Sequence, residues 1–465
     1  MTRKVLGAWY TPPALVALVL DQVLEPVLAA TASPDRLRIL DPACGDGRFL
    51  VAAAERIQAR FGFVPPGCLH GIDIDPGAAA AARTALPLAE VRCGDALSGV
   101  LAPHFDVVVG NPPFLNQLAR ATNRGGRSRW GGGPYADAAA VFLARALEAA
   151  RPDGGRVGLV LPLSVLSTRD AAPIRAAALA AARLDSLWWA TEPMFDADVL
   201  TCIATFERGA RQGVVLRSHG TDFAGVPCVD GADLATRPTW SHLVADVAGV
   251  PPVALDATRT LADMATATAD FRDQYYGLVP FVADDVTGPP LVTSGLIDVG
   301  RSAWSERPAR FARRTFAAPR VAVDALSPGL QAWAAARLVP KVLVATQTPV
   351  IEVAVDAGGE WLPSVPVITV VPRTPDDLWR VAAVLTAPAA SAWAAGTYLG
   401  AALAPTAIKL SASQVVTLPL PVRPWDDAAA ALSAGDVDQC ARLMDVAYGT
   451  ELFDWWRGRL TRRSR

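Results

Sequence analysis

The residues with the clearest chemical potential end the stretch "FDVVVGNPPF" (105–114), where an apolar β-branched run leads directly into an asparagine and two prolines. Asn111 offers a side-chain carbonyl as an acceptor. Pro112 offers a backbone carbonyl with a fixed direction, because Pro112 and Pro113 lock φ at two positions. Two such acceptors could hold both N–H groups of a planar amine and favour a tetrahedral, nucleophilic nitrogen. Phe114 adds a ring on which a base could stack. The structural alternative is an ordinary Pro-Pro turn with a buried phenylalanine.

Acidic residues follow three strand-like segments upstream of this stretch. Asp41 lies in "ILDPACGDGRFL", Asp73 and Asp75 in "LHGIDIDP", and Asp95 in "VRCGDAL". Open α/β sheets bind ligands beyond the carboxyl ends of their strands, so these acids are expected at one edge. A carboxylate there can accept both hydroxyls of a ribose, and Asp73 and Asp75 remain alternatives for that role. Asp95 could accept an adenine amine. The alternative is that each acid caps the helix that follows it.

The turn after the first strand narrows the choice of cofactor. Gly45, Asp46 and Gly47 give the turn bare backbone, but no third glycine follows at the spacing of a dinucleotide fingerprint. Asp46 would also repel a pyrophosphate at the start of the next helix. We therefore disfavour a dinucleotide-dependent oxidoreductase, and a positively charged cofactor suits these acids better.

The elements that position these residues follow an α/β pattern up to about residue 210, with a mostly parallel sheet. After that point prolines and glycines become frequent and the alternation of strands and helices is lost. We predict a catalytic domain over 1–210, a mixed α+β domain over 211–430, and closing helices with a basic tail over 431–465. The predicted strands of the first domain are 36–40, 68–74, 89–94, 105–110, 155–162, 184–190 and 202–209.

Five motifs, "GAWYTPPALVALVL", "ILDPACGDGRFL", "LHGIDIDP", "VRCGDAL" and "FDVVVGNPPF", occur in this order. Together they resemble S-adenosylmethionine-dependent DNA adenine methyltransferases in which a target-recognition domain follows the catalytic domain. The resemblance covers roughly residues 5–210 and implies a Rossmann-like, seven-stranded, mostly parallel sheet with S-adenosylmethionine as cofactor. It also implies that Tyr10 and Thr11 lie near the methionine moiety, that Asp41, Ala43, Cys44, Gly45 and Gly47 form the methionine-side turn, that Asp73 holds the ribose, and that Asp95 and Ala96 meet the adenine ring.

The same resemblance implies duplex DNA as the partner, with the target base flipped out of the helix. Phe195, in "EPMFDADVLTCIATF", corresponds to an aromatic that stacks on the flipped base, although a core position is an equal alternative. Two arginine-rich stretches could neutralise phosphates, or could be solvated basic faces. They are 115–135, with Arg124, Arg127 and Arg129, and 301–320, with Arg313 among aromatic residues.

The composition of the chain limits the class of protein to which it can belong. The chain has 465 residues, 52% of them hydrophobic, and a net charge of −2, so bulk charge does not indicate a nucleic-acid partner. Its six cysteines form no CxxC pair, so we expect no metal site. The apolar runs are shorter than the roughly 20 residues of a bilayer span, which predicts a cytoplasmic protein without membrane attachment.

Two other functions remain open. The Asn-Pro-Pro-Phe signature also suits a methyltransferase that acts on an RNA base amine or on a protein glutamine amide, and a catalytically silent DNA-binding subunit is the second alternative. A separate restriction or defence subunit is an expected partner of the enzyme. The recognition sequence cannot be derived from these residues, because base readout depends on groove geometry.

Overall fold

The computed structural model describes residues 10–98, 101, 104–114, 136–195, 199–270, 272–400, 402 and 407–461. The chain forms two compact units, Met1–Val247 and Ala248–Arg465. The predicted boundary at 210 is therefore wrong, because two further strands continue the first sheet beyond that residue. The predicted segments 211–430 and 431–465 are likewise not separate, since helix α14 (Asp426–Ser433) runs across the boundary between them.

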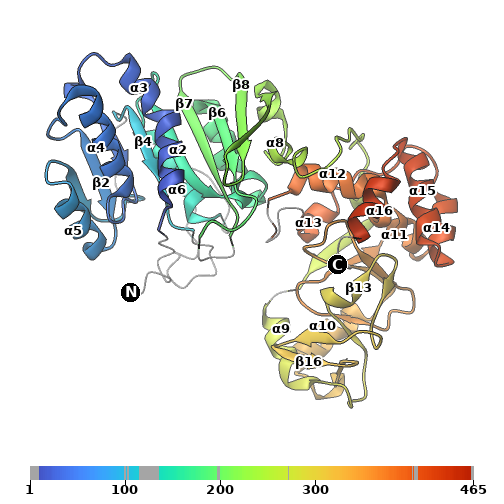
Figure 1. Ribbon diagram of the computed structural model, residues 1–465. Helices are drawn as coiled ribbons and strands as arrows, with labels where there is room; N and C mark the ends of the chain where they lie inside the picture. Colours follow the sequence, from blue (N-terminus) through green and yellow to red (C-terminus); the bar gives the residue numbers. More distant parts are fainter. Residues whose placement is uncertain are drawn as a thin grey trace. The chain divides into compact units, whose positions relative to one another are not determined.

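Unit 1 is built on a nine-stranded sheet with the order β3-β2-β1-β4-β5-β7-β6-β8-β9 (Figure 1). Its first seven strands form the predicted mostly parallel sheet, in which β7 alone runs antiparallel to its neighbours β5 and β6. The sheet is wider than predicted because β8 pairs with β6 and β9 closes the edge. The strands are β1 Ile39–Asp41, β2 Leu69–Asp73, β3 Glu90–Cys93, β4 Val107–Gly110, β5 Arg156–Pro162, β6 Ala182–Trp189, β7 Thr201–Arg208, β8 Val214–His219 and β9 Ala224–Asp230.

Helices cover the sheet of unit 1. Those of the N-terminal half pack through one large apolar cluster onto alternate residues of the strands, as the two-residue period of a strand requires. The helices Ala138–Ala149 and Ala172–Ala181 contact β4, β5 and β6. The helices are α2 Pro13–Val23, α3 Glu25–Ala30, α4 Arg48–Phe61, α5 Pro76–Ala85, α6 Ala138–Ala149, α7 Ala172–Ala181 and α8 His242–Ala245.

The window Pro13–Ala30 is long and apolar enough to cross a membrane by length and composition, and 44% of it is buried within the protein. Helix α2 contacts β5 and β7, and its Leu15, Leu20 and Val23 are fully buried. Packing onto the sheet therefore accounts for its apolar character.

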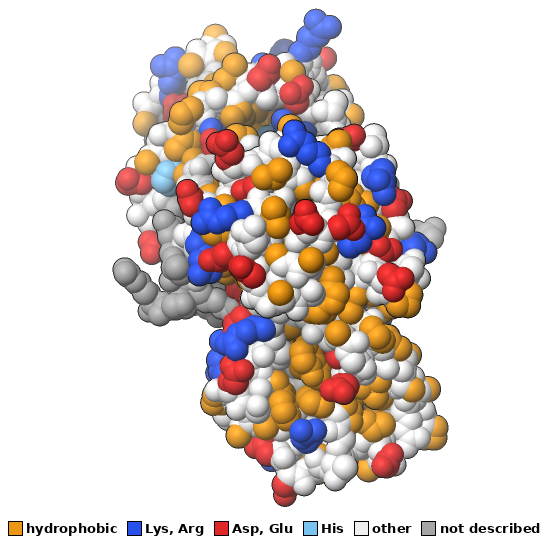
Figure 2. Space-filling model, turned by 90° about the vertical axis from the view of Figure 1, so that its right-hand side faces the viewer, with side chains coloured by type: hydrophobic (Ala, Val, Ile, Leu, Met, Phe, Trp, Pro, Cys, Tyr) orange, Lys and Arg blue, Asp and Glu red, His pale blue; other side chains and the backbone are white. Residues whose placement is uncertain are grey.

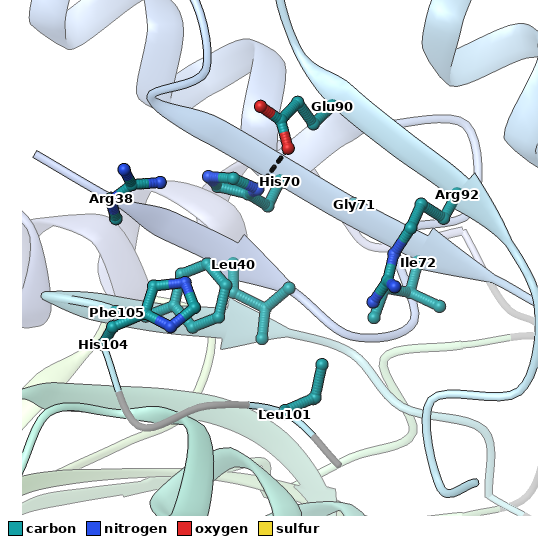
Figure 3. A pocket seen from close by; sticks show the side chains of 10 residues that line it. All are labelled: Arg38, Leu40, His70, Gly71, Ile72, Glu90, Arg92, Leu101, His104 and Phe105. Carbon is teal, nitrogen blue, oxygen red and sulfur yellow. Dashed lines mark ion pairs between the residues drawn. The ribbon is translucent and has the colours of Figure 1, made fainter. Parts of the chain in front are cut away.

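A cavity of about 330 Å³ lies over β1, β2 and β3, on the face away from α4 (Figure 3). His70 and Ile72 point into it, whereas the intervening Gly71 approaches Cys44 and Leu50 on the α4 side. His70 Nδ1 lies 3.4 Å from a Glu90 carboxylate oxygen. None of the predicted site residues lines this cavity, so it is separate from the carboxyl edge of the sheet.

Unit 2 is mixed α+β, as predicted, with a four-stranded antiparallel sheet in the order β10-β21-β18-β19. The segment 341–356 forms two strands, because Gln347 takes a φ of 64° and Pro349 has no N–H to donate. The strands are β10 Ala265–Ala269, β11 Val282–Ala283, β12 Leu291–Val292, β13 Ile297–Asp298, β14 Arg301–Ser302, β15 Ala309–Phe311, β16 Arg314–Phe316, β17 Arg320–Val321, β18 Lys341–Val344, β19 Val353–Asp356, β20 Leu362–Pro363 and β21 Ile368–Pro372. The helices are α9 Arg272–Leu278, α10 Pro328–Arg337, α11 Leu378–Thr386, α12 Pro388–Tyr398, α13 Ala412–Val415, α14, α15 Val437–Tyr448 and α16 Phe453–Thr461.

Candidate active site

Asn111 directly follows β4, at the carboxyl edge of the sheet. Its side-chain amide donates a hydrogen bond to Thr11 Oγ1 at 3.0 Å, and Thr11 is itself buried. The Asn111 carbonyl oxygen, Oδ1, is also buried, and within the described residues it has no hydrogen-bond partner. An unsatisfied buried acceptor is costly, so such a group calls for a functional explanation. Thr11 therefore fixes the amide so that an acceptor is held ready for an incoming N–H group.

Two aromatic side chains, Phe114 of the Asn-Pro-Pro-Phe segment and Phe195, lie next to each other. Phe114 and Phe195 approach edge to face, with ring centroids 6.0 Å apart and an interplanar angle of 84°. Both are only partly buried where they pack against the main apolar cluster of unit 1. The structure thus brings Phe195 to the Asn-Pro-Pro-Phe segment, while its role in stacking on a flipped base stays a prediction.

The turn after β1 is held by two carboxylates. Buried Asp41 accepts a hydrogen bond from the Ala43 N–H at 3.0 Å. Gly45 adopts a φ of 55°, which favours glycine, and donates its N–H to Asp73 Oδ2 at 2.7 Å. Gly47, with a φ of 93°, is the N-cap residue of α4. Hydrogen bonds therefore hold the shape of this turn, with Asp73 of the neighbouring strand β2 as its anchor, and its role beside the methionine moiety stays a prediction.

The two acids at the end of β2 differ in their hydrogen bonds. Asp75 caps α5, accepting from the N–H groups of Gly77 at 2.7 Å and Ala78 at 3.3 Å. Asp73 accepts one bond at each oxygen, from Gly45 and from the Asp75 N–H at 2.8 Å. A carboxylate has about four lone-pair positions, so Asp73 can accept further donors. The capping alternative thus applies to Asp75, and Asp73 is the better candidate for a ribose.

Asp95 and Ala96 follow β3. Asp95 is exposed, and its Oδ1 accepts from the Leu97 N–H at 2.9 Å. Ala96 is buried, and its carbonyl accepts from Nε of the buried Arg145 of α6 at 2.9 Å. The hydrogen bond from Arg145 to Ala96 therefore fixes the loop after β3, and the side chain of Asp95 is exposed to solvent.

Gly110 was missed by the sequence analysis. A Cβ at this position would lie 2.6 Å from Asp41 Oδ1, so a side chain here would displace the carboxylate of the neighbouring strand. A glycine immediately before Asn-Pro-Pro was the available signal. The role of Thr11 as the partner of Asn111 was also missed, since residues 100 positions apart give no local pattern.

Arg48, the first residue of α4, contacts two side chains near the turn after β1. Tyr10 is exposed, and the guanidinium carbon of Arg48 lies 3.4 Å from its ring centroid. Arg48 also pairs with Asp46 at 3.0 Å, so Asp46 is partly neutralised. Burial raises the pKa of the Cys44 thiol, with the nearby carboxylates of Asp41 and Asp73 acting in the same direction. Cys44 is therefore a protonated packing residue and not a nucleophile.

Burial, with a smaller contribution from Asp73, raises the pKa of Asp41 from 3.8 to about 8. Below pH 4 both the folded and the unfolded chain hold this proton; between pH 4 and 8 only the folded chain does. The stabilising contribution of Asp41 is therefore full at low pH and is lost as the pH rises through the folded pKa.

We expect Asp41→Asn to gain stability relative to the wild type from about pH 5 to pH 8, measured by thermal melting. Asp46→Asn is the matched control, and equal pH profiles for the wild type and Asp41→Asn would contradict this assignment.

Of the four arginines predicted to contact DNA, the structure describes one, Arg313. Arg124, Arg127 and Arg129 lie outside the described residues. Arg313 lies in unit 2, at the turn between β15 and β16. Within the described residues no group of three His, Cys, Asp or Glu side chains could hold a metal ion.

Known proteins resemble the two units to different extents. The model of the N-6 DNA methylase family matches residues 1–223. The Type II methyltransferase M.TthHB8I of Thermus thermophilus is 34% identical over 109 residues, which are 23% of this chain and 21% of that protein. The Type II methyltransferase M.VspI of Vibrio sp. is 26% identical over 185 residues, 37% of this chain and 41% of that protein. The matches thus cover less than half the length of these curated relatives.

A solved structure extends the likeness in fold to nearly the whole chain. The Type IIL restriction-modification enzyme MmeI, solved in complex with DNA, has a TM-score of 0.63 at 13% identity, over 99% of this chain and 80% of that one. At this identity the likeness concerns the fold alone. The segment that the N-6 DNA methylase model matches, residues 1–223, contains all the motifs at the carboxyl edge of the sheet and is similar to that family.

Proposed function

We propose that this protein transfers a methyl group from S-adenosylmethionine to the exocyclic amine of adenine in duplex DNA. The observation that carries the proposal is the buried Asn111 Oδ1, held by the Thr11 contact and lacking a partner within the described residues. The biological setting that fits is restriction–modification or phage defence in the cytoplasm, with a separate restriction or defence subunit and without membrane attachment.

The proposal follows from the chemistry of the amine. The lone pair of an adenine amine is delocalised into the ring, so the amine is a poor nucleophile. Asn111 Oδ1 and the Pro112 carbonyl can accept its two N–H groups and stabilise the charge that develops on the nitrogen. The ring of Phe114, with Phe195 beside it, offers a stacking surface for a base that has left the duplex.

The described residues also fit the proposed cofactor. S-adenosylmethionine would supply an electrophilic methyl group on a positively charged sulfur. Asp73 retains acceptor positions for ribose hydroxyls, and Asp95 has a solvent-facing carboxylate oxygen for an adenine amine. Asp41, beneath the turn, holds a proton at neutral pH that a neighbouring cation would displace.

The decisive experiment incubates the purified protein with methyl-labelled cofactor and, separately, duplex DNA, ribosomal RNA and protein substrates. Label in duplex DNA on N6 of adenine is the expected result. Label confined to RNA or to protein glutamine would overturn the choice of substrate. Cofactor binding without transfer to any substrate would identify the chain as a silent DNA-binding subunit. Sequencing methylated DNA from an expressing host would then give the recognition sequence.

The aromatic pair gives a separate prediction. Phe114→Ala and Phe195→Ala are each expected to weaken binding of a flipped base by about 1–3 kcal/mol, the usual contribution of one stacking contact. A duplex with 2-aminopurine at the target position reports flipping by its fluorescence, which should rise on binding the wild type and rise less with either variant. If Phe195→Ala matches the wild type while Phe114→Ala does not, Phe195 is only a core residue.

A further inference from the structure

One hairpin of unit 2, residues 309–316, combines a buried apolar face with exposed arginines. Strands β15 and β16 pair antiparallel, with Phe311 opposite Arg314, so that only Ala312 and Arg313 form the turn. The inner face of the hairpin is firmly anchored, because Phe311 and Phe316 are buried in an apolar cluster of unit 2. The tip is held as well, since the Ala312 N–H donates to the Tyr275 hydroxyl at 3.0 Å.

The turn is chemically unusual. Ala312 and Arg313 have φ values of 49° and 63°, as a two-residue turn of this hand requires. Such turns normally carry Asn-Gly, because side chains with a Cβ are strained at positive φ. In this chain Ala312 and Arg313 adopt these φ values in spite of that strain, and Arg313 lies at the tip of the hairpin. Strain of this kind is typical of functional sites that the surrounding structure holds in place.

The six arginines of the 301–320 stretch are not equivalent. Arg301 pairs with Glu306 at 2.7 Å, Arg307 pairs with Asp298 at 2.9 Å, and Arg320 donates to the Gly288 carbonyl at 2.8 Å. The exposed side chains of Arg310, Arg313 and Arg314 have no ion pair or hydrogen bond within the described part of the chain, and Arg314 lies over the Phe316 ring, 5.0 Å from its centroid.

The charges around these unpaired arginines show whether they belong to a larger basic surface. On the face drawn in Figure 2, acidic and basic side chains are interspersed, as expected for a chain with a net charge of −2. The hairpin itself, residues 309–316, contains Arg310, Arg313 and Arg314 and no acidic residue, so its own charge is positive.

We propose that the hairpin 309–316 enters the major groove of duplex DNA and that Arg313 reads a guanine there. This inference rests on the proposed DNA substrate and names a specificity-determining residue for it. A two-stranded ribbon fits the major groove, where each base pair presents a distinct pattern of donors and acceptors. Arginine makes the commonest specific contact in that groove, a bidentate pair to guanine O6 and N7. Arg310, on the outer face of the hairpin, is placed to contact the phosphate backbone.

The test measures binding, so that it does not depend on methyl transfer. Wild type, Arg313→Ala and Arg307→Ala each select duplexes from a random DNA library. Arg307→Ala is the matched control, since it removes the same charge from the same stretch but at an arginine that already has an acid partner. We expect the wild type and Arg307→Ala to select the same sequence, and Arg313→Ala to lose its preference for guanine at one position by about 10- to 100-fold.

A chemical probe assigns the contact to a base edge. Replacing that guanine with 7-deazaguanine removes the N7 acceptor, and should weaken binding of the wild type but not of Arg313→Ala. The double variant Ala312→Asn/Arg313→Gly, whose turn sequence suits the backbone, should melt at a higher temperature and show the same loss of preference. The proposal is overturned if Arg313→Ala selects the wild-type sequence, if it weakens all sequences equally, or if the wild type prefers RNA or no sequence at all. Sequence-selective binding without methylation would instead reject the proposed enzymatic function and retain the reading hairpin.

Discussion

Asn111→Ala is expected to lower the rate of methyl transfer to duplex DNA by about 100- to 1,000-fold, the usual effect of removing one preorganised hydrogen-bonding group from a site of developing charge. The substitution removes the buried Oδ1 acceptor and leaves only the Pro112 carbonyl to hold the amine. The affinity for S-adenosylmethionine should change little, because the acids that follow β1, β2 and β3 are untouched. Single-turnover rates with labelled cofactor and calorimetric titration of the cofactor measure the two quantities separately.

Thr11→Val is the graded companion of this variant. Valine keeps the shape of threonine but removes the hydroxyl that accepts from the Asn111 amide at 3.0 Å. The Oδ1 acceptor remains but is no longer fixed in direction, so we expect a loss of transfer of about 10-fold, since catalysis depends on held geometry. A rate for Asn111→Ala within a few-fold of the wild type, with normal melting, would show that Oδ1 does not hold the amine.

The parts of the fold that the sequence predicted correctly, and the site residues that it singled out, depend on local patterns. Strands β1 to β7 were recognisable because short β-branched runs alternate with alanine-rich helices, and the Asn-Pro-Pro-Phe segment is contiguous at the end of one of those strands. Its chemistry can be derived from residue types and from the restricted backbone of proline. The same holds for the glycine turn after β1, where Gly45 adopts a φ of 55°.

The parts that were missed depend on contacts between distant residues. Strands β8 and β9 lie where the helix–strand alternation ends, and only their pairing with β6 and with each other shows that unit 1 continues. Gly110 is required by a carboxylate on a neighbouring strand, and the hairpin turn is unusual because Ala312 and Arg313 replace the residues that such a turn favours. None of these features has a local periodicity that sequence reasoning could detect.

Asp73 and Asp75 make different hydrogen bonds, and this difference gives the second large prediction. Both acids end the same strand, but Asp75 uses its carboxylate to cap α5, while Asp73 supports the cofactor turn through Gly45. We expect Asp73→Ala to weaken S-adenosylmethionine binding by about 100-fold, because hydrogen bonds to a charged group contribute roughly 1.5–3 kcal/mol each.

Asp75→Ala should give the opposite pair of results. Loss of the helix cap is expected to lower the free energy of unfolding by about 1 kcal/mol, with little effect on cofactor affinity. Asp73→Asn separates the two tasks of Asp73, since an asparagine oxygen can still accept from the Gly45 N–H but carries no charge for the ribose. Its affinity should therefore lie between those of the wild type and Asp73→Ala. If Asp75→Ala loses cofactor affinity and Asp73→Ala keeps it, the ribose is held by the second acid, and α5 must be capped in another way when the cofactor is bound.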